Sequence, residues 1–116
     1  MILADVSIKG RMRKTVMLPA KGGYVYTLDR ATGEFLSAWK FAKNVTWVSG
    51  ITENGKLVGR REPELNKSIT VCPSVSGAKS WNQAAWSPRQ GLLFVPVQEL
   101  CNELIARDDP ATEGQV

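Results

Sequence analysis

The sequence predicts an all-β fold of about eight short antiparallel strands. Apolar and polar residues alternate with a period of two in several short stretches, these stretches are rich in β-branched and aromatic residues, and glycine-containing turns separate them. Each turn supplies a glycine where a positive φ is expected. The expected strands cover residues 2–8, 15–18, 24–28, 34–41, 56–58, 69–72, 84–86 and 92–97, and the turns fall at 9–10, 22–23, 29–33, 54–55 and 87–91.

Residues 97–106 differ from the rest because their apolar side chains have helix-like spacing, which predicts a helical turn. Residues 107–116 are acidic and contain proline and glycine, so we expect a disordered tail there. The sequence therefore predicts one folded domain over residues 1–106, followed by the tail.

The composition of the 116 residues is that of an ordinary globular protein, with 43% hydrophobic and 22% charged residues. The net charge of +4 is scattered along the chain, so nucleic acid is not an expected partner. Apolar runs are shorter than the roughly 20 residues of a membrane span, and the first residues lack the features of a signal peptide. The chain has no histidine, which argues against a self-contained hydrolase.

Two segments, "LDRATGEFLSAW" and "WSPRQGLLFVPV", each place a polar turn ending in glycine directly before an alternating apolar strand. This unit, recurring among short antiparallel strands, is typical of β-propeller blades, which are four-stranded antiparallel sheets. The chain is long enough for about two blades. Two blades cannot close a ring and leave open strand edges, so we expect the chain to be part of something larger. A small sandwich or open barrel is the alternative.

Several residues have side chains or positions that suggest a role. Lys21 precedes Gly22 and Gly23, where a ligand or another backbone can approach closely, so Lys21 is either a fixed cation facing an anion or an exposed loop lysine. The segment "DRATG" is interpreted as a turn whose aspartate accepts backbone hydrogen bonds. Trp39 and Phe41 alternate on one strand face and are assigned to the core.

A polar and aromatic cluster, Lys79 to Gln83, follows Gly77 and can either line a planar ligand or satisfy backbone groups within a loop. Cys72 and Cys101 are the only cysteines. They are compatible with one disulfide, which would stabilise the fold by roughly 3 kcal/mol, or with two buried thiols. A metal site is disfavoured because the sequence offers no third soft ligand.

Taken together and in order, these stretches resemble the quinoprotein alcohol dehydrogenases, the methanol/ethanol dehydrogenase family, which uses pyrroloquinoline quinone (PQQ) and is built on an eight-bladed β-propeller. The segment "MLPAKGGYVYTLDRATGEFLSAWKFAKNVTW" is similar to the family's Lys-Asn-Gly, aromatic strand, Leu-Asp-Arg and Thr-Gly run. The segment "CPSVSGAKSWNQAAWSPRQGLLFVPVQELC" is similar to its Cys-Pro, Gly-x-Lys/His-Asn-Trp and Ser-Pro-x-x-Gly-Leu run. The resemblance implies an internal or C-terminal-side fragment of a propeller whose parent enzyme oxidises primary alcohols to aldehydes.

The resemblance also implies site residues. Lys21 corresponds to the family's basic residue that contacts the carbonyl oxygens of the quinone and polarises its dione, although Gly22 stands where the family has asparagine. Ser80, Trp81 and Asn82 are the other expected cofactor-binding residues, with Ser80 in place of the family's asparagine. Cys72 and Cys101 match a cysteine pair that is bridged in the methanol dehydrogenase branch, which agrees with the periplasmic location of these enzymes.

In the family, the catalytic aspartate and the calcium or lanthanide ligands lie N-terminal to the matched region. The chain is therefore expected to contain no catalytic or metal-ligating residue and to be inactive alone. The implied partners are the remaining propeller blades, a small alcohol substrate and a cytochrome-type electron acceptor. The alternative function is a non-catalytic β-propeller-like module that pairs with another chain through exposed strand edges.

Overall fold

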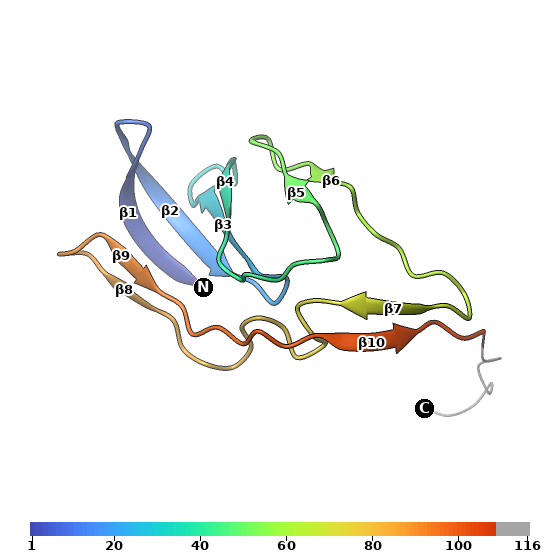
Figure 1. The fold of residues 1–116 in the computed structure, drawn as a ribbon. Helices are drawn as coiled ribbons and strands as arrows, with labels where there is room; N and C mark the ends of the chain where they lie inside the picture. The colour runs from blue at the N-terminus through green and yellow to red at the C-terminus, as the bar shows by residue number, and fades with distance from the viewer. Residues whose placement is uncertain (109–116) are drawn as a thin grey trace, which may run out of the picture.

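The computed structural model describes residues 1–108, and in these residues the chain is all-β, as predicted (Figure 1). β1 to β4 form a four-stranded antiparallel sheet in sequence order, and three two-stranded sheets pair β5 with β6, β8 with β9 and β7 with β10. The strands are β1 (Ile2–Ile8), β2 (Arg11–Pro19), β3 (Tyr24–Asp29), β4 (Phe35–Lys40), β5 (Gly50–Ile51), β6 (Leu57–Val58), β7 (Ser68–Val71), β8 (Ala85–Ser87), β9 (Leu92–Phe94) and β10 (Asn102–Ile105).

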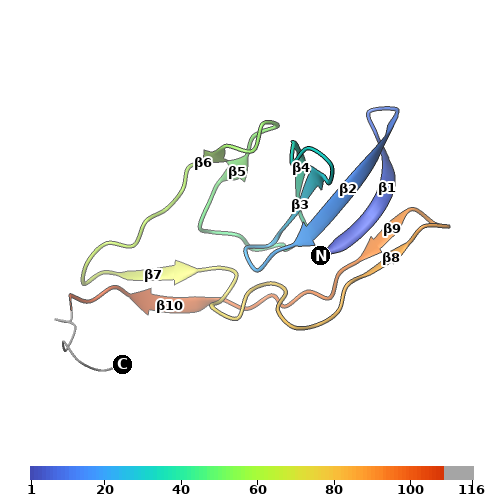
Figure 2. The same cartoon turned by 180° about the vertical axis from the view of Figure 1, so that it is seen from behind.

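The core lies on one face of the four-stranded sheet, where the β8–β9 hairpin covers it (Figures 1 and 2). Ala4, Met17 and Val25 are buried there, and Trp86 and Leu93 of the hairpin pack against them. These residues come from alternate positions of neighbouring strands, so the period-two pattern of the sequence places them on the same face. The hydrophobic core is therefore formed between two segments of the chain that lie far apart in the sequence.

The repeated turn predicted from the sequence has the same geometry in both copies. The Gly33 amide donates a hydrogen bond of 2.8 Å to the carbonyl of Asp29, and the Gly91 amide donates one of 2.8 Å to the carbonyl of Ser87. Both glycines have positive φ, 77° and 65°, which side-chain-bearing residues adopt at a cost. One turn leads into β4 and the other into β9, so the two segments are equivalent connections within their sheets.

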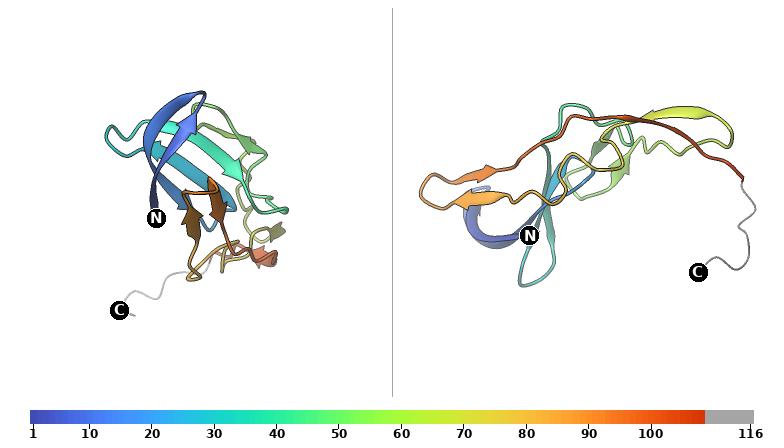
Figure 3. Two further views of the ribbon diagram at one scale, coloured as in Figure 1. Left: turned by 90° about the vertical axis from the view of Figure 1, so that its left-hand side faces the viewer. Right: turned by 90° about the horizontal axis from the view of Figure 1, so that it is seen from below.

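The described chain has an open, elongated shape (Figure 3). Its radius of gyration is 17.2 Å and its longest extent is 52 Å, whereas a compact domain of this length has a radius of about 13 Å. The two-stranded sheets leave strand edges unpaired, as expected for part of a β-propeller. One blade-like sheet is complete, and the other strands form pairs where full four-stranded sheets were expected.

Two predictions are wrong: the assignment of Trp39 to the core and the helical turn at residues 97–106. Trp39 is 62% exposed and does not belong to the core, because the β8–β9 hairpin packs near β1, at the opposite edge of the sheet from β4. Phe41, by contrast, packs against the core as predicted.

The predicted helical turn at residues 97–106 is absent, because this segment contains β10, which pairs with β7. Leu104 and Ile105 are exposed there, so the apparent helical periodicity does not correspond to a buried face. No helix able to cross a membrane occurs within residues 1–108. Residues 109–116 of the predicted tail lie outside the described residues.

Candidate functional site

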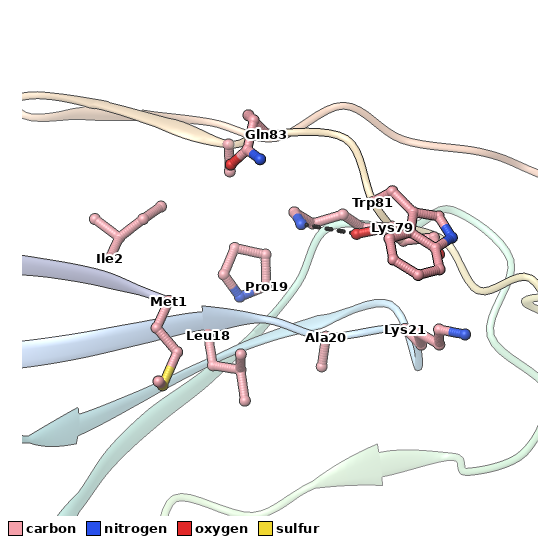
Figure 4. A pocket seen from close by; sticks show the side chains of 11 residues that line it. Met1, Ile2, Leu18, Pro19, Ala20, Lys21, Lys79, Trp81 and Gln83 are labelled. Atoms are coloured by element: carbon pink, nitrogen blue, oxygen red, sulfur yellow. Dashed lines mark hydrogen bonds between the residues drawn. The ribbon is translucent and has the colours of Figure 1, made fainter.

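A pocket of ≈ 630 Å³ brings together three segments of the chain: the start of β1, the end of β2 with the turn that follows it, and the segment before β8 (Figure 4). Met1 and Ile2 lie at one end of the pocket, and Lys21 and Trp81 lie at the other. Its lining residues are Met1, Ile2, Leu18, Pro19, Ala20, Lys21, Lys79, Ser80, Trp81, Gln83 and Ala84. The pocket therefore has an apolar end and a polar, aromatic end.

Lys21 lies in the tight turn between β2 and β3. The Gly23 amide donates a 3.1 Å hydrogen bond to the carbonyl of Ala20, and the Ala20 amide donates a 2.9 Å bond to the carbonyl of Tyr24. The space left by the missing Gly22 side chain is filled by the chain itself, since a Cβ there would lie 3.1 Å from the ring of Trp47. Trp47 also donates its indole hydrogen to the Gly22 carbonyl at 3.0 Å. These contacts fix the turn that carries Lys21.

Backbone hydrogen bonds join this turn to the segment that carries Ser80 and Trp81. The Ala78 amide donates to the carbonyl of Lys21 at 2.8 Å, and the Gln98 amide donates to the carbonyl of Ala78 at 2.7 Å. Trp81 follows, and this residue is 92% exposed. Segments that are far apart in the sequence are thus held side by side, and both contribute to one pocket.

The predicted site residues are brought together only in part. Lys21, Ser80 and Trp81 line the pocket, whereas Asn82 does not. Lys79 lines it as well, and its ammonium group donates a 3.2 Å hydrogen bond to the carbonyl of Ser80. Lys79 and Gln83 belong to the polar cluster visible in the sequence, whereas no sequence pattern indicates that Met1, Ile2 and Leu18 form the opposite wall.

The pocket has a positive electrostatic character. Two of its lining side chains, Lys21 and Lys79, carry ammonium groups, and its lining contains no carboxylate side chain. Cations of this kind attract a bound anion. The described residues contain no group of three or more potential metal-ligating side chains.

The disulfide between Cys72 and Cys101 closes the segment that carries Lys79 to Trp81, as predicted. Its cysteines are 29 positions apart in the sequence, and their Cα atoms lie 4.4 Å apart. Thr46 holds the backbone of Cys72, the buried cysteine, in place. The Thr46 hydroxyl accepts a 2.9 Å hydrogen bond from the Cys72 amide, and the Thr46 amide donates a 2.9 Å hydrogen bond to the Cys72 carbonyl. The bridge therefore anchors both ends of the segment to the β7–β10 pair.

The turn that begins at Asp29 has a structural role and lies apart from the pocket. Its carboxylate accepts hydrogen bonds from the amides of Ala31 and Thr32 at 2.9 and 3.1 Å, and from the Arg13 guanidinium at 3.1 Å. The two amides, followed by Arg13, lower the pKa of Asp29 from its ordinary value. Burial raises the pKa of Tyr26, which lies on β3, the strand that ends at Asp29. The prediction that this segment makes a turn is confirmed.

Comparison with known proteins identifies related enzymes. No protein-family model matches the chain. A quinohemoprotein alcohol dehydrogenase of Comamonas testosteroni is 36% identical over 101 residues, and a lanthanide-dependent methanol dehydrogenase of Methylorubrum extorquens is 35% identical over 113 residues. These matches cover 86% and 87% of the chain. The chain is homologous to a segment of the quinoprotein alcohol dehydrogenases.

Solved structures of these dehydrogenases share the fold of this segment. A europium-containing methanol dehydrogenase superimposes on 93% of the chain with a TM-score of 0.84 and 30% identity. The Comamonas testosteroni quinohemoprotein alcohol dehydrogenase superimposes on 90% of the chain with a TM-score of 0.81 and 34% identity. The chain spans 14% and 19% of the two curated relatives named above, so it corresponds to a small part of a quinoprotein alcohol dehydrogenase.

Proposed function

We propose that this chain contributes part of the PQQ site of an alcohol dehydrogenase that oxidises primary alcohols to aldehydes. The observation that supports this proposal most strongly is the pocket shared by Lys21, Ser80 and Trp81. These residues come from the two segments that resemble the cofactor-binding stretches of the family.

The pocket fits the chemical character of the cofactor. PQQ is planar and carries carboxylates and an ortho-dione, so it requires cations, an aromatic or apolar surface and hydrogen-bond donors. The lining supplies the ammonium groups of Lys21 and Lys79, the exposed indole of Trp81 and the amide of Gln83. A lining without carboxylate side chains also avoids repulsion of a polyanionic ligand.

Each of these residues has a distinct task in the proposed site. Lys21 would donate a hydrogen bond to the dione and would stabilise negative charge on its oxygen. Lys79 balances the charge of a carboxylate, and Trp81 offers a flat face that excludes water. When bound, the cofactor supplies the oxidising power that removes two electrons and two protons from the alcohol.

Other parts of the proposed enzyme lie outside these residues. In this proposal the remaining propeller blades would supply a general base and the ligands of a calcium or lanthanide ion. A cytochrome-type protein receives the electrons, and the enzyme works in the periplasm, where the Cys72–Cys101 disulfide persists. Asn82 does not line the pocket and remains a predicted cofactor-binding residue.

A segment exchange tests the proposal. This chain would replace the matching segment of the Comamonas testosteroni enzyme, and bound PQQ and dye-coupled alcohol oxidation would be measured. Lys21→Ala in this hybrid should lower the rate by about tenfold to a thousandfold, because it removes a charge that stabilises the developing oxyanion. Lys56→Ala is the matched control, since Lys56 is exposed and does not line the pocket.

Equal rates for the Lys21→Ala, Lys56→Ala and unmodified hybrids would contradict the proposed role of Lys21. A hybrid that folds but retains no PQQ would contradict the cofactor site as a whole. Isothermal titration of PQQ into the chain itself provides a second, activity-independent measurement, with the same two variants as test and control.

A second candidate function is pairing with another chain through open strand edges and exposed apolar side chains. The observation that favours it is the exposure of Leu3, Met12 and Trp39 on the four-stranded sheet. Light scattering coupled to size-exclusion chromatography tests it: a concentration-dependent dimer supports pairing, and a monomer at all concentrations contradicts it.

A further inference from the structure

The side chain of Lys21 requires a structural restraint if it is to serve as a fixed cation. Lys21 is exposed, and no side chain or carbonyl within residues 1–108 accepts a hydrogen bond from its ammonium group. A free lysine side chain carries about 2 kcal/mol of rotamer entropy. Any element that restricts its first carbons therefore lowers the entropy lost when the ammonium group engages a ligand.

Gly77 packs directly against these first carbons. Its φ is +86°, and a Cβ added at Gly77 would lie 2.7 Å from both Cβ and Cγ of Lys21 and 2.9 Å from its Cα. Carbon atoms that are not bonded to one another do not approach this closely, so the position accepts only glycine while Lys21 keeps its conformation. The backbone of Gly77 thus occupies one side of the Lys21 side chain.

Gly77 is itself held in place by a series of backbone hydrogen bonds. The Gly77 amide donates to the Ser74 carbonyl at 2.7 Å, and the Ser74 amide donates to the Leu100 carbonyl at 2.7 Å. Ala78 is fully buried and, as described above, bonds both to Lys21 and to Gln98. Residues 74–78 therefore form a restrained segment between the disulfide and the turn that carries Lys21.

We propose that Gly77 is a positioning residue for Lys21: by excluding the space on one side of the Lys21 stem, it restricts the directions from which the ammonium group can reach a bound quinone. This inference rests on the function proposed above. It assigns a role to a residue that does not line the pocket and that carries no side chain of its own.

The variant Gly77→Ala tests the proposal, with Gly33→Ala as a matched control. Both glycines have positive φ, 86° and 77°, so both substitutions impose similar backbone strain. A Cβ at Gly33, however, meets no atom within 4 Å. Any effect found only at Gly77 therefore arises from the contact with Lys21 and not from backbone strain.

The first readout needs no cofactor. Three-bond couplings to Cγ of isotope-labelled Lys21 report its first side-chain torsion angle. We expect a single rotamer in the unmodified chain and in Gly33→Ala, and a different rotamer or a rotamer mixture in Gly77→Ala. Nuclear Overhauser contacts between the Gly77 α-protons and the Lys21 β- and γ-protons of the unmodified chain test the same packing if Gly77→Ala does not fold. Unchanged couplings in a folded Gly77→Ala chain, or missing Overhauser contacts, would overturn the proposal.

The second readout is the affinity for PQQ, measured by titration. Gly77→Ala should weaken binding about tenfold, because it displaces the cation. In the Lys21→Ala background, the same substitution should have no further effect, as expected when one residue acts through the other. Equal weakening in both backgrounds would overturn the positioning role. If the unmodified chain and the Comamonas testosteroni hybrid both fail to bind PQQ, the proposed function fails, and the coupling measurement still decides the role of Gly77.

Discussion

The disulfide between Cys72 and Cys101 makes a stability contribution that can be calculated from the structure. Its cysteines are 29 positions apart, so in the chain-entropy description the bridge lowers the entropy of the unfolded chain by about 12 cal/mol/K. At 25 °C this corresponds to about 3.6 kcal/mol. Because single domains are stable by only about 5–15 kcal/mol, the double variant Cys72→Ala/Cys101→Ala should lose a large fraction of its free energy of unfolding.

Urea unfolding followed by tryptophan fluorescence measures this loss. Dithiothreitol should destabilise the unmodified chain by a similar amount and leave the double-alanine variant unchanged, which separates loss of the cross-link from loss of packing around the buried Cys72 sulfur. A difference below about 1 kcal/mol between the oxidised chain and the variant would refute the reasoning, since it would mean that the unfolded chain is already restricted around this loop.

Two further predictions concern the four-stranded sheet. Thr15→Val should lower the free energy of unfolding by about 1 kcal/mol, because the hydroxyl of the fully buried Thr15 donates a 2.8 Å hydrogen bond to the Ala4 carbonyl. Urea unfolding measures this change, and equal or greater stability of the variant would contradict the prediction. The lowered pKa of Asp29 means that its carboxylate stabilises the fold above about pH 3.9 and that this contribution is lost as the pH falls further. Asp29→Asn should therefore show a weaker loss of stability between pH 5 and pH 2, and an unchanged pH dependence would rule out this contribution.

The sequence predicts the secondary structure well where the strands have one buried face. Alternation identified β1, β3 and β4, and the glycine-ending turns after Asp29 and Ser87 were predicted as equivalent units. Alternation fails for β10, because its apolar side chains are exposed and its position depends on pairing with β7. A short segment without a buried face has no reliable hydrophobic period, so the helix-like spacing of residues 97–106 does not indicate a helix.

Trp39 shows a second limit of sequence analysis. An aromatic residue on a strand is usually buried, but whether a particular sheet edge is covered depends on where distant segments pack. The hairpin that covers β1 does not reach β4, and only the three-dimensional structure reveals this.

The candidate site was predicted in part, and the two parts have different origins. The pairing of Lys21 with Ser80 and Trp81 came from family resemblance, because local patterns leave the role of each residue open. The contact between Gly77 and Lys21 had no signal in the sequence beyond a glycine, since it depends on a hydrogen-bonded approach between segments that are distant in the chain.

The central claim is that Lys21 and Trp81 belong to one pocket that binds the quinone cofactor. The most direct test is a titration of the isotope-labelled chain with PQQ, followed by the amide and indole signals in nuclear magnetic resonance spectra. The account predicts saturable changes confined to the pocket, that is, to the start of β1, to residues around Lys21 and to the Lys79–Ala84 segment, with the β1–β2 turn at Gly10 unaffected. No change in the pocket signals, or changes centred on other surfaces, would contradict it.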